Sequence, residues 1–174
     1  MILRDRQNVE RESMSSFAQY ASPLGRIFLA ADSEGIAALW FEGQVLPEAA
    51  RALSAASPPA PVLMEAELWL DRYFSGQPPQ FTPALHLTGT PFRLQVWHQL
   101  TGIPWGATVT YGELSARLPG SSPRAVGGAV GHNPVALMLP CHRVTGAGGA
   151  MTGYAGGIWR KRWLLEMEAS GKRP

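Results

Sequence analysis

A proline- and glycine-rich stretch near the middle of the chain, GQPPQFTPALHLTGT at residues 76–90, most constrains what this sequence can fold into. Proline lacks a backbone donor and glycine disfavours regular structure, so such a stretch indicates a connection between elements. It predicts that the 174 residues form two units. Residues 17–88 are interpreted as an N-terminal α/β domain and residues 89–174 as a C-terminal domain, after a polar, flexible leader at 1–16.

The N-terminal half has the pattern of strands followed by helices. In LGRIFLAADSEGIAALWF, two apolar segments flank the turn cluster DSEG at 32–35, which predicts a hairpin with a four-residue loop. Residues 47–56 predict a short helix that SPPAP at 57–61 ends. An amphipathic helix is predicted over 62–75 and closed by Gly76; its apolar residues are Leu63, Leu68, Leu70, Tyr73 and Phe74.

The C-terminal half begins with helix-start signals. Thr90 is placed to cap the helix PFRLQVWHQL, whose first residue is proline. Thr110 and Glu113 form the capping-box pattern of a helix that extends to about Leu118. Ser122 then caps a second helix, RAVGGAVGHN, which has proline at its first position. Two short helices joined by a glycine-containing turn are typical of a helix-turn-helix unit.

The second of these helices has almost no side chains on its surface. Ala125, Gly127, Gly128 and Gly131 are all small, and each interior glycine costs about 1 kcal/mol relative to alanine. Close approach to another surface would explain them, and two surfaces remain open: a DNA groove or a neighbouring helix. Such a helix offers few base-reading donors, so a DNA contact would be to backbone and shape. Arg124 is the one long side chain placed to enter a duplex.

Cys141 is the only cysteine, which excludes an internal disulfide and a cysteine-based zinc site. The apolar run ALMLP predicts a buried strand that delivers Cys141 to a turn. A nucleophilic cysteine must be a thiolate, and either His142 or Arg143 can lower its pKa. Glu168, in a helix predicted over 158–170, is the acidic residue suited to orient His142. The alternative interpretation is a small buried hydrophobic residue.

A glycine-rich segment, TGAGGAMTGYAGG, follows the cysteine. A loop beside a nucleophile can form the wall of a pocket, and Tyr154 can stack there on a planar ligand. The segment is not a phosphate-binding loop, because the pattern GxxxxGK[ST] is absent.

Charge and hydropathy limit the partners. The net charge of +2 is small, but basic residues gather in the last third of the chain, which indicates either an anionic partner or a solvated basic tail. The basic residues are Arg117, Arg124, Arg143, Arg160, Lys161, Arg162, Lys172 and Arg173. No apolar run approaches the roughly 18 residues of a membrane span, and the polar N-terminus is not a secretory signal. A lone thiol suits a reducing cytosol, so we expect a cytoplasmic protein.

Taken together, these motifs resemble the O6-alkylguanine-DNA alkyltransferases, also called methylated-DNA–protein-cysteine methyltransferases. The resemblance covers roughly residues 89–170 and is carried by TPFRLQVWHQL, IPWGATVTYGEL, RAVGGAVGHNP, LPCHRV, MTGYAGG and RKRWLLEMEA. It implies a ribonuclease-H-like N-terminal domain with a small antiparallel sheet, and a helical, winged-helix-like C-terminal DNA-binding domain. The implied activity is irreversible transfer of an alkyl group from O6-alkylguanine to Cys141, once per protein, and repair of O4-alkylthymine is left open by the sequence.

The resemblance also implies residue roles. His142 would act through a water on the thiol, Glu168 would hold His142, and Asn133 would brace the turn before the active site. Tyr111 would push on the phosphate and rotate the nucleotide out, while Tyr154 would line the guanine pocket. The DNA-binding residues would be Arg124, which replaces the flipped base in the stack, and Ala125, Gly128, Gly131 and Arg143.

This chain departs from the family pattern at a few positions. His132 falls within the predicted second helix, where a small or more basic residue is expected. Ala155 replaces a serine donor found in some members, which would loosen substrate discrimination. A zinc site that some members build from cysteines is not possible with one cysteine.

The implied partner is double-stranded DNA carrying alkylated bases, with no membrane, no cofactor or metal, no obligate protein partner and a monomeric state. Three other functions remain as alternatives. A non-catalytic sensor of alkylated DNA would lack the acceptor cysteine, and a helix-turn-helix regulator would carry base-reading side chains. A cysteine hydrolase would turn over an ester or amide without DNA.

Overall fold

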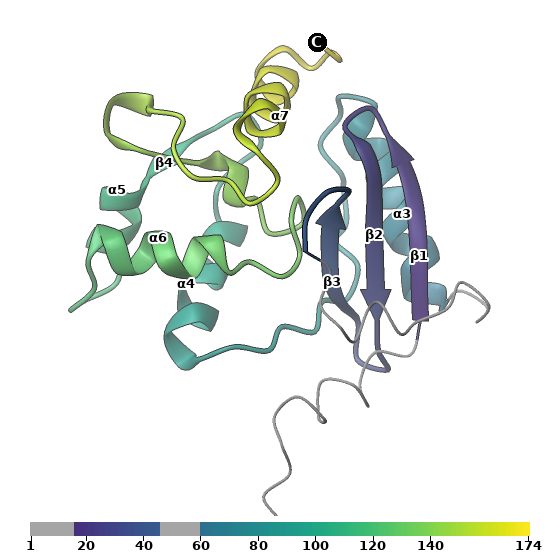
Figure 1. Ribbon diagram of the computed structural model, residues 1–174, viewed down its shortest axis with the longest axis horizontal. Coiled ribbons are helices and arrows are strands. Elements are labelled where there is room, and N and C mark those ends of the chain that lie inside the picture. Colours follow the sequence, from purple (N-terminus) through teal and green to yellow (C-terminus); the bar gives the residue numbers. More distant parts are fainter. Residues whose placement is uncertain (1–15, 46–59) are drawn as a thin grey trace, which may run out of the picture.

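The computed structural model describes residues 16–45 and 60–174. A three-stranded sheet with one helix on its face lies on one side of the molecule, and a group of short helices lies on the other (Figure 1). The predicted flexible leader and the predicted helix at 47–56 fall outside these residues, apart from residue 16. The described part is therefore of mixed α/β class, with the helices concentrated in the C-terminal half.

The N-terminal sheet is antiparallel in the order β1 (Ser16–Ser22), β2 (Gly25–Ala31) and β3 (Ile36–Phe41). The hairpin predicted at 24–41 is therefore confirmed. Asp32 shapes its turn, because its carboxylate accepts the backbone N–H groups of Glu34 and Gly35 at 2.8 and 3.1 Å. The predicted amphipathic helix is α3 (Pro61–Phe74), and it packs its buried face on the sheet.

Beyond α3 the chain runs as an extended connection against the start of β3. Ile36 donates to the carbonyl of Ala84 at 2.8 Å, and His86 donates back to the carbonyl of Ile36 at 2.9 Å. A Cβ at Gly35 would lie 2.5 Å from the Ala84 oxygen, so only glycine fits this approach. The linker predicted from composition thus exists, but it is attached to the sheet.

The C-terminal half contains α4 (Pro91–Thr101), α5 (Tyr111–Ala116), α6 (Pro123–Gly131) and α7 (Ile158–Ser170). The three predicted caps are present: Thr90 accepts from Arg93, Thr110 and Glu113 form a capping box, and Ser122 accepts from Ala125. Two short strands, β4 (Val109–Thr110) and β5 (Val144–Thr145), pair in parallel beside α5. The pair α5 and α6 is the predicted helix-turn-helix unit, although α5 ends two residues before Leu118.

The predicted buried strand over ALMLP is wrong. Residues 134–136 instead pair with the edge strand β3, where Leu39 donates to the carbonyl of Pro134 at 2.8 Å. The chain then turns sharply, with Leu137 at a φ of 69°, and enters a 3-10 helix, η1 (Cys141–Arg143). An apolar run alone does not separate a strand from a buried turn, and here a partner distant in sequence decides.

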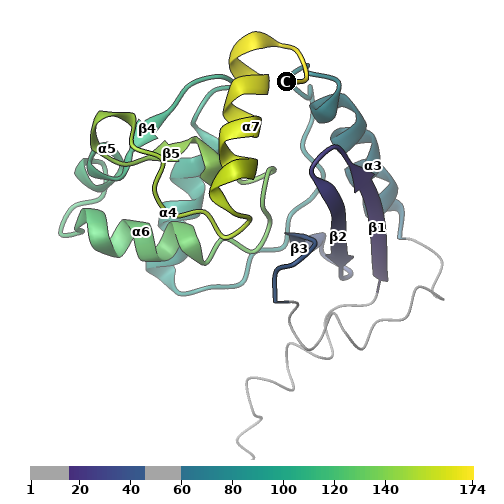
Figure 2. The same ribbon diagram turned by 45° about the horizontal axis from the view of Figure 1, so that its top comes forward.

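The C-terminal helix α7 connects the two halves. Figure 2 shows it between the sheet and the helices of the C-terminal half. Its Leu164 and Met167 are fully buried in the same apolar cluster as the sheet, α3 and Val135. A second cluster joins α4, α5 and α6 around Trp97 and Val126. The core of the N-terminal sheet is therefore completed by residues of the C-terminal half.

Candidate active site

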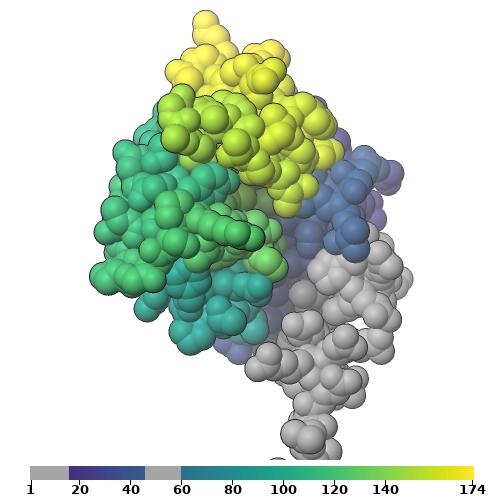
Figure 3. Space-filling view, turned by 60° about the vertical axis from the view of Figure 1, so that its left-hand side comes forward, coloured from purple at the N-terminus to yellow at the C-terminus, as the bar shows by residue number. Residues whose placement is uncertain are grey.

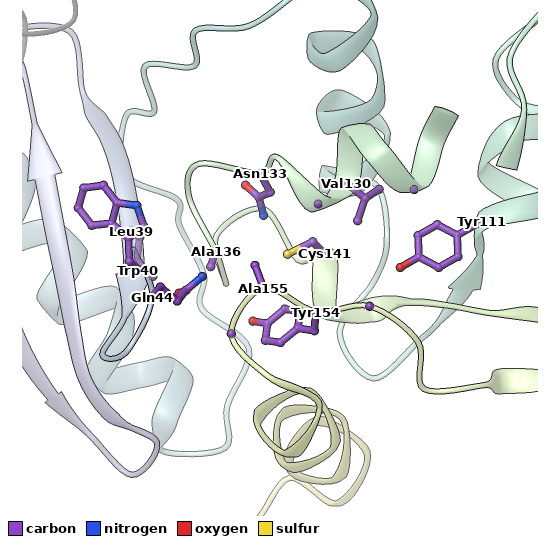
Figure 4. A pocket seen from close by; sticks show the side chains of 14 residues that line it. Leu39, Trp40, Gln44, Tyr111, Val130, Asn133, Ala136, Cys141, Tyr154 and Ala155 are labelled. Atoms are coloured by element: carbon purple, nitrogen blue, oxygen red, sulfur yellow. The ribbon is translucent and has the colours of Figure 1, made fainter. Parts of the chain in front are cut away.

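Cys141 lines a cavity of about 260 Å³ between the two halves of the molecule. Figure 4 shows Tyr111 and Val130 on one side of the thiol and Trp40 and Gln44 on the other. In Figure 3 a hollow lies between the green chain of α6, the yellow-green C-terminal segment and the blue end of β3. The cavity is thus built from both halves, with the thiol near its centre.

Burial dominates the electrostatics of Cys141. It raises the pKa of the thiol, and the side-chain amide of Asn133 and the charge of Lys161 offset only part of this. The hypothesis that His142 or Arg143 lowers this pKa holds only for the backbone N–H of His142, which lowers it slightly; neither side chain is among its causes. The resting cysteine is a protonated thiol that needs a base to become a nucleophile.

Asn133 holds the turn between α6 and the cysteine. Its amide nitrogen donates to the carbonyl of Leu139 at 2.8 Å, and its side-chain oxygen accepts the N–H of Val135 at 3.0 Å. The backbone N–H of Cys141 donates to the same Leu139 carbonyl at 2.7 Å. One side chain therefore fixes both ends of the turn that presents the thiol.

His142 and Glu168 form a buried pair behind the cysteine. His142 Nε2 donates to Glu168 Oε1 at 2.8 Å, and neither side chain is exposed. A carboxylate oxygen only accepts, so the hydrogen of neutral His142 is assigned to Nε2. Burial lowers the pKa of His142, and the hydrogen bond to Glu168 opposes this only in part. His142 is therefore neutral, and its Nδ1 has no hydrogen-bond partner within the described residues.

The guanidinium of Arg143 is hydrogen-bonded to the carboxylate of Glu168. Its Nε and NH2 groups donate to the two carboxylate oxygens at 2.8 and 3.0 Å, and NH1 donates to the carbonyl of Ile103 at 2.6 Å. Burial alone would raise the pKa of Glu168, but the hydrogen bonds from His142 and Arg143 and the charge of Arg143 hold it well below its ordinary value. This placement argues against the DNA contact expected for Arg143.

The outer face of α6 is free of contacts. Arg124, Ala125, Gly128 and Gly131 are exposed, and a Cβ at either Gly128 or Gly131 would meet nothing within 4 Å. Tight packing on a neighbouring helix therefore does not explain these two glycines. Only a Cβ at Gly127 would touch a neighbour, the Tyr111 ring at 3.7 Å. His132 is the C-cap residue of α6 and not an interior position, which corrects the expectation from sequence.

Two tyrosines line the cavity. Tyr154 comes from the glycine-rich segment, and its buried hydroxyl has no partner among the residues described. Tyr111 is the first residue of α5 and is half-buried. Burial raises the pKa of both phenols, which keeps them protonated as hydrogen-bond donors.

Fewer basic side chains lie on the surface of the C-terminal half than the sequence predicts. Lys161 is fully buried and donates to the carbonyls of Val144 and Thr152, the latter at 2.9 Å. Arg160 binds backbone carbonyls, and Arg143 is the partly buried partner of Glu168. Within the described residues the exposed members of this basic set are Arg117, Arg124, Arg162, Lys172 and Arg173.

Sequence reasoning missed several residues of the site. Tyr73 hydrogen-bonds to Glu168, and Trp40 and Gln44 line the cavity from the N-terminal half. Tyr73 was counted as a core residue of an amphipathic helix, which it also is. No local signal distinguishes these residues, because Tyr73 is 95 positions from Glu168, and Trp40 and Gln44 are more than 90 positions from Cys141.

The fold and the site together define a class: an α/β protein in which a helix-turn-helix unit lies beside a single buried cysteine. Comparison with known proteins makes this specific. The profile described as the DNA-binding domain of 6-O-methylguanine DNA methyltransferase matches residues 91–170, and the profile of its ribonuclease-like domain matches residues 16–87. The chain belongs to the 6-O-methylguanine DNA methyltransferase family, as the resemblance in its motifs implied.

Relatives support this assignment. The methylated-DNA–protein-cysteine methyltransferase of Haemophilus influenzae is 37% identical over 87% of this chain and 85% of that protein. That of Methanosarcina acetivorans is 40% identical over 88% and 98%. The relative from Mycobacterium tuberculosis strain H37Rv is 52% identical, but the match spans 58% of this chain and only 62% of the relative's length.

A solved structure has the same fold. The crystal structure of Mycobacterium tuberculosis OGT in complex with DNA has a TM-score of 0.77 at 40% identity. The match covers 90% of this chain and 94% of that one. The predicted fold class, an N-terminal domain with a small antiparallel sheet and a helical C-terminal DNA-binding domain, is confirmed.

Proposed function

We propose that this protein repairs DNA by taking an alkyl group from O6 of guanine onto Cys141, once per molecule. The observation that carries the proposal is the position of the thiol. It lies in a cavity beside the contact-free face of α6, with a neutral histidine and a carboxylate behind it. A DNA-binding surface and a nucleophile therefore meet at one pocket.

In this proposal α6 enters a groove of the duplex. Its glycines allow the backbone to approach the phosphates closely, and the face offers almost no base-reading donors. Binding is then nearly independent of sequence, as damage repair requires. Arg124, exposed at the start of α6, fills the space left by the flipped base, and Tyr111 presses on the adjacent phosphate.

The alkylated base must leave the stack to reach the thiol, because Cys141 lies in a cavity that a base within the duplex cannot enter. Extrusion costs a few kcal/mol and least for a poorly paired base. The cavity takes up the base, with Tyr154 as one wall. The buried hydroxyl of Tyr154 supplies a donor to the base, since no protein group described here uses it.

The reaction begins with removal of the thiol proton. His142 Nδ1 takes it through one bridging water, while Glu168 stabilises the imidazolium that forms. The sulfur attacks the alkyl carbon, an S–C bond forms and the bond from that carbon to O6 breaks. Guanine leaves with the electron pair and takes up a proton, which balances the one removed from the thiol and restores a normal base. The thioether is stable, so the protein is consumed.

The chemistry of the site sets the remaining expectations. The transfer uses only side chains of this chain, and the described residues contain no group of three or more side chains suited to hold a metal ion. No helix in 16–45 or 60–174 is long and apolar enough to cross a membrane. We place the reaction in the cytoplasm, because Cys141 must stay reduced to react. O4-alkylthymine is a second substrate in this proposal, and the protein acts as a monomer.

The first test is the intact mass of the protein after incubation with a duplex that holds one O6-methylguanine. We expect one added methyl, located on Cys141 by peptide mapping, and saturation at one per protein. The Cys141→Ala variant should bind the duplex like the wild type and gain no mass, because the thiol is not part of the surface of α6.

Other outcomes lead to other functions. Tight binding without added mass in the wild type indicates a sensor of damaged DNA, and sequence-selective binding indicates a regulator. Repeated hydrolysis of an ester or amide without DNA indicates a cysteine hydrolase. Transfer that persists in Cys141→Ala refutes the acceptor role of this residue.

A further inference from the structure

One residue of the N-terminal half reaches the buried pair behind the cysteine. Tyr73 is the penultimate residue of α3 and only 1% exposed. Its hydroxyl donates to Glu168 Oε1 at 2.7 Å. The same phenol oxygen lies 3.2 Å from His142 Nε2, whose hydrogen it shares with the carboxylate. Tyr73 therefore contacts both members of the pair at the atoms through which they contact each other.

The ring of Tyr73 is fixed on several sides. It stacks on Trp69 with centroids 5.1 Å apart and meets Trp105 edge-on at the same distance. It also meets the His142 ring edge-on, at 6.3 Å and an interplanar angle of 85°. This packing holds the hydroxyl in place, so its direction does not depend on the hydrogen bonds alone.

The carboxylate of Glu168 accepts from four residues. Arg143 supplies the charged donors, and the N–H of Gly106 donates to Oε2 at 3.1 Å. Tyr73 and His142 share Oε1 with the NH2 group of Arg143. Because Oε1 is already bound by the phenol, it offers His142 an acceptor of fixed position and reduced basicity.

We propose that Tyr73 is a positioning residue for alkyl transfer: its hydroxyl fixes Glu168 and the Nε2 hydrogen of His142, so that Nδ1 remains the acceptor for the thiol proton. The inference rests on the proposed function of this site. It makes the N-terminal half part of the chemistry and not only a support for it. Burial raises the pKa of Tyr73 well above its ordinary value, so the phenol stays a donor throughout the reaction.

The charges around His142 come from three elements. Glu168 and Lys161 belong to α7, Arg143 and Cys141 flank His142 in η1, and Tyr73 comes from α3. Glu168 raises the pKa of His142, whereas Arg143 and Lys161 lower it together with burial. A variant without the Tyr73 hydroxyl lacks this hydrogen bond to Oε1, so the carboxylate of Glu168 becomes more basic. It then stabilises protonated His142 more strongly.

The test compares Tyr73→Phe with Tyr20→Phe. Phenylalanine keeps the ring contacts and removes only the hydroxyl. Tyr20 is the matched control, because its hydroxyl also donates to a carboxylate, Asp71 at 2.8 Å, in the same half of the molecule. Methyl transfer from an O6-methylguanine duplex is followed against pH, and the ring nitrogens of His142 are titrated by ¹⁵N NMR.

For Tyr73→Phe we expect the acid limb of the transfer profile and the His142 titration to move to higher pH. Transfer at about pH 6 should slow roughly threefold or more, with a smaller effect at about pH 8. Tyr20→Phe should leave both curves unchanged. A tyrosine that only packs would alter stability and leave both midpoints in place, which would overturn the proposal.

Two further readouts separate the possible failures. If the wild type transfers no methyl, the proposed function fails, and the His142 titration still tests the contact with Tyr73. If Tyr73→Phe does not fold, the wild type decides: its Tyr73 hydroxyl proton should exchange slowly and show a nuclear Overhauser contact to His142 Hε2. A rapidly exchanging hydroxyl without that contact contradicts the positioning role.

Discussion

At the scale of single residues, the reactivity of Cys141 is a balance of opposing effects. Burial raises the pKa of the thiol, whereas the Asn133 amide and the Lys161 charge lower it. Asn133 also binds Leu139 and Val135, so it couples the shape of the turn to the electrostatics of the sulfur. The same side chain therefore influences both where the thiol lies and how readily it ionises.

Asn133→Asp should raise the pKa of Cys141. The carboxylate retains an acceptor for the Val135 N–H but places a negative charge beside the thiolate and loses the donor to Leu139. Stability should fall by about 1–3 kcal/mol. The rate of iodoacetamide labelling against pH measures the thiol directly. Gln44→Glu is the control, because Gln44 lines the same cavity and is not among the causes of the Cys141 pKa. Equal shifts of the Cys141 pKa in both variants would contradict the role of Asn133.

The sequence allowed the prediction of some of these residues and not others. Cys141 and His142 are predictable because they lie in one short motif, Glu168 because it is an acidic residue of the predicted last helix, and Asn133 through the resemblance of its segment to the family. Tyr73 and Lys161 are not, because a tyrosine on an apolar helix face and a lysine in a basic run both have common structural explanations. Which side chain is turned inward depends on tertiary contacts.

At the scale of elements, α6 combines a poor helix composition with an open surface. Its start was predictable, since a cap residue and a first-turn proline act locally, whereas its end at Gly131 lies two residues before the predicted one. The turn before Cys141 was not predictable, because its backbone pairs with β3 from the other half of the chain. Local signals thus determined the helices, and long-range pairing determined the segment that presents the thiol.

Gly128→Ala should stabilise the protein and weaken DNA binding. A Cβ at Gly128 meets nothing within 4 Å, so the change contributes about 1 kcal/mol through helix propensity alone. The added methyl would separate the helix from the groove. Thermal unfolding and titration with a fluorescent duplex measure the two effects.

The control is Gly102→Ala, because Gly102 is an exposed glycine at the end of α4. This variant should leave DNA affinity unchanged. If Gly128→Ala bound the duplex as tightly as the wild type, the glycines of α6 would not serve groove contact.

At the scale of the whole molecule, the two halves predicted from the linker behave structurally as one body. The core of the sheet includes Val135, Leu164 and Met167 from the C-terminal half. The pocket takes Trp40 and Gln44 from the N-terminal half. The proline- and glycine-rich linker correctly predicts where the secondary structure changes. Its composition does not predict how the two halves pack against each other.

Arg160 provides a test of this connection. Its guanidinium donates to the carbonyls of Leu24 and Glu42, in turns next to the sheet strands, at 3.0 and 3.1 Å, and to that of Gly156 beside Tyr154 at 2.8 Å. It also lies 4.9 Å from the ring of Phe41, which packs against Tyr154. One side chain therefore ties the wall of the base pocket to the sheet.

Arg160→Lys should loosen this wall, because an ammonium group on a flexible stem cannot reach three carbonyls in the planar geometry of a guanidinium. We expect a loss of about 1–3 kcal/mol in the free energy of unfolding and slower methyl transfer from free O6-methylguanine. The pH midpoint of Cys141 labelling should not change, since Arg160 does not contribute to the thiol pKa. Arg162→Lys, its exposed neighbour, is the matched control. Urea unfolding measures the stability, and single-turnover transfer measures the rate. If Arg160→Lys and Arg162→Lys behave alike in both, the pocket wall does not depend on the sheet, and the two halves function independently.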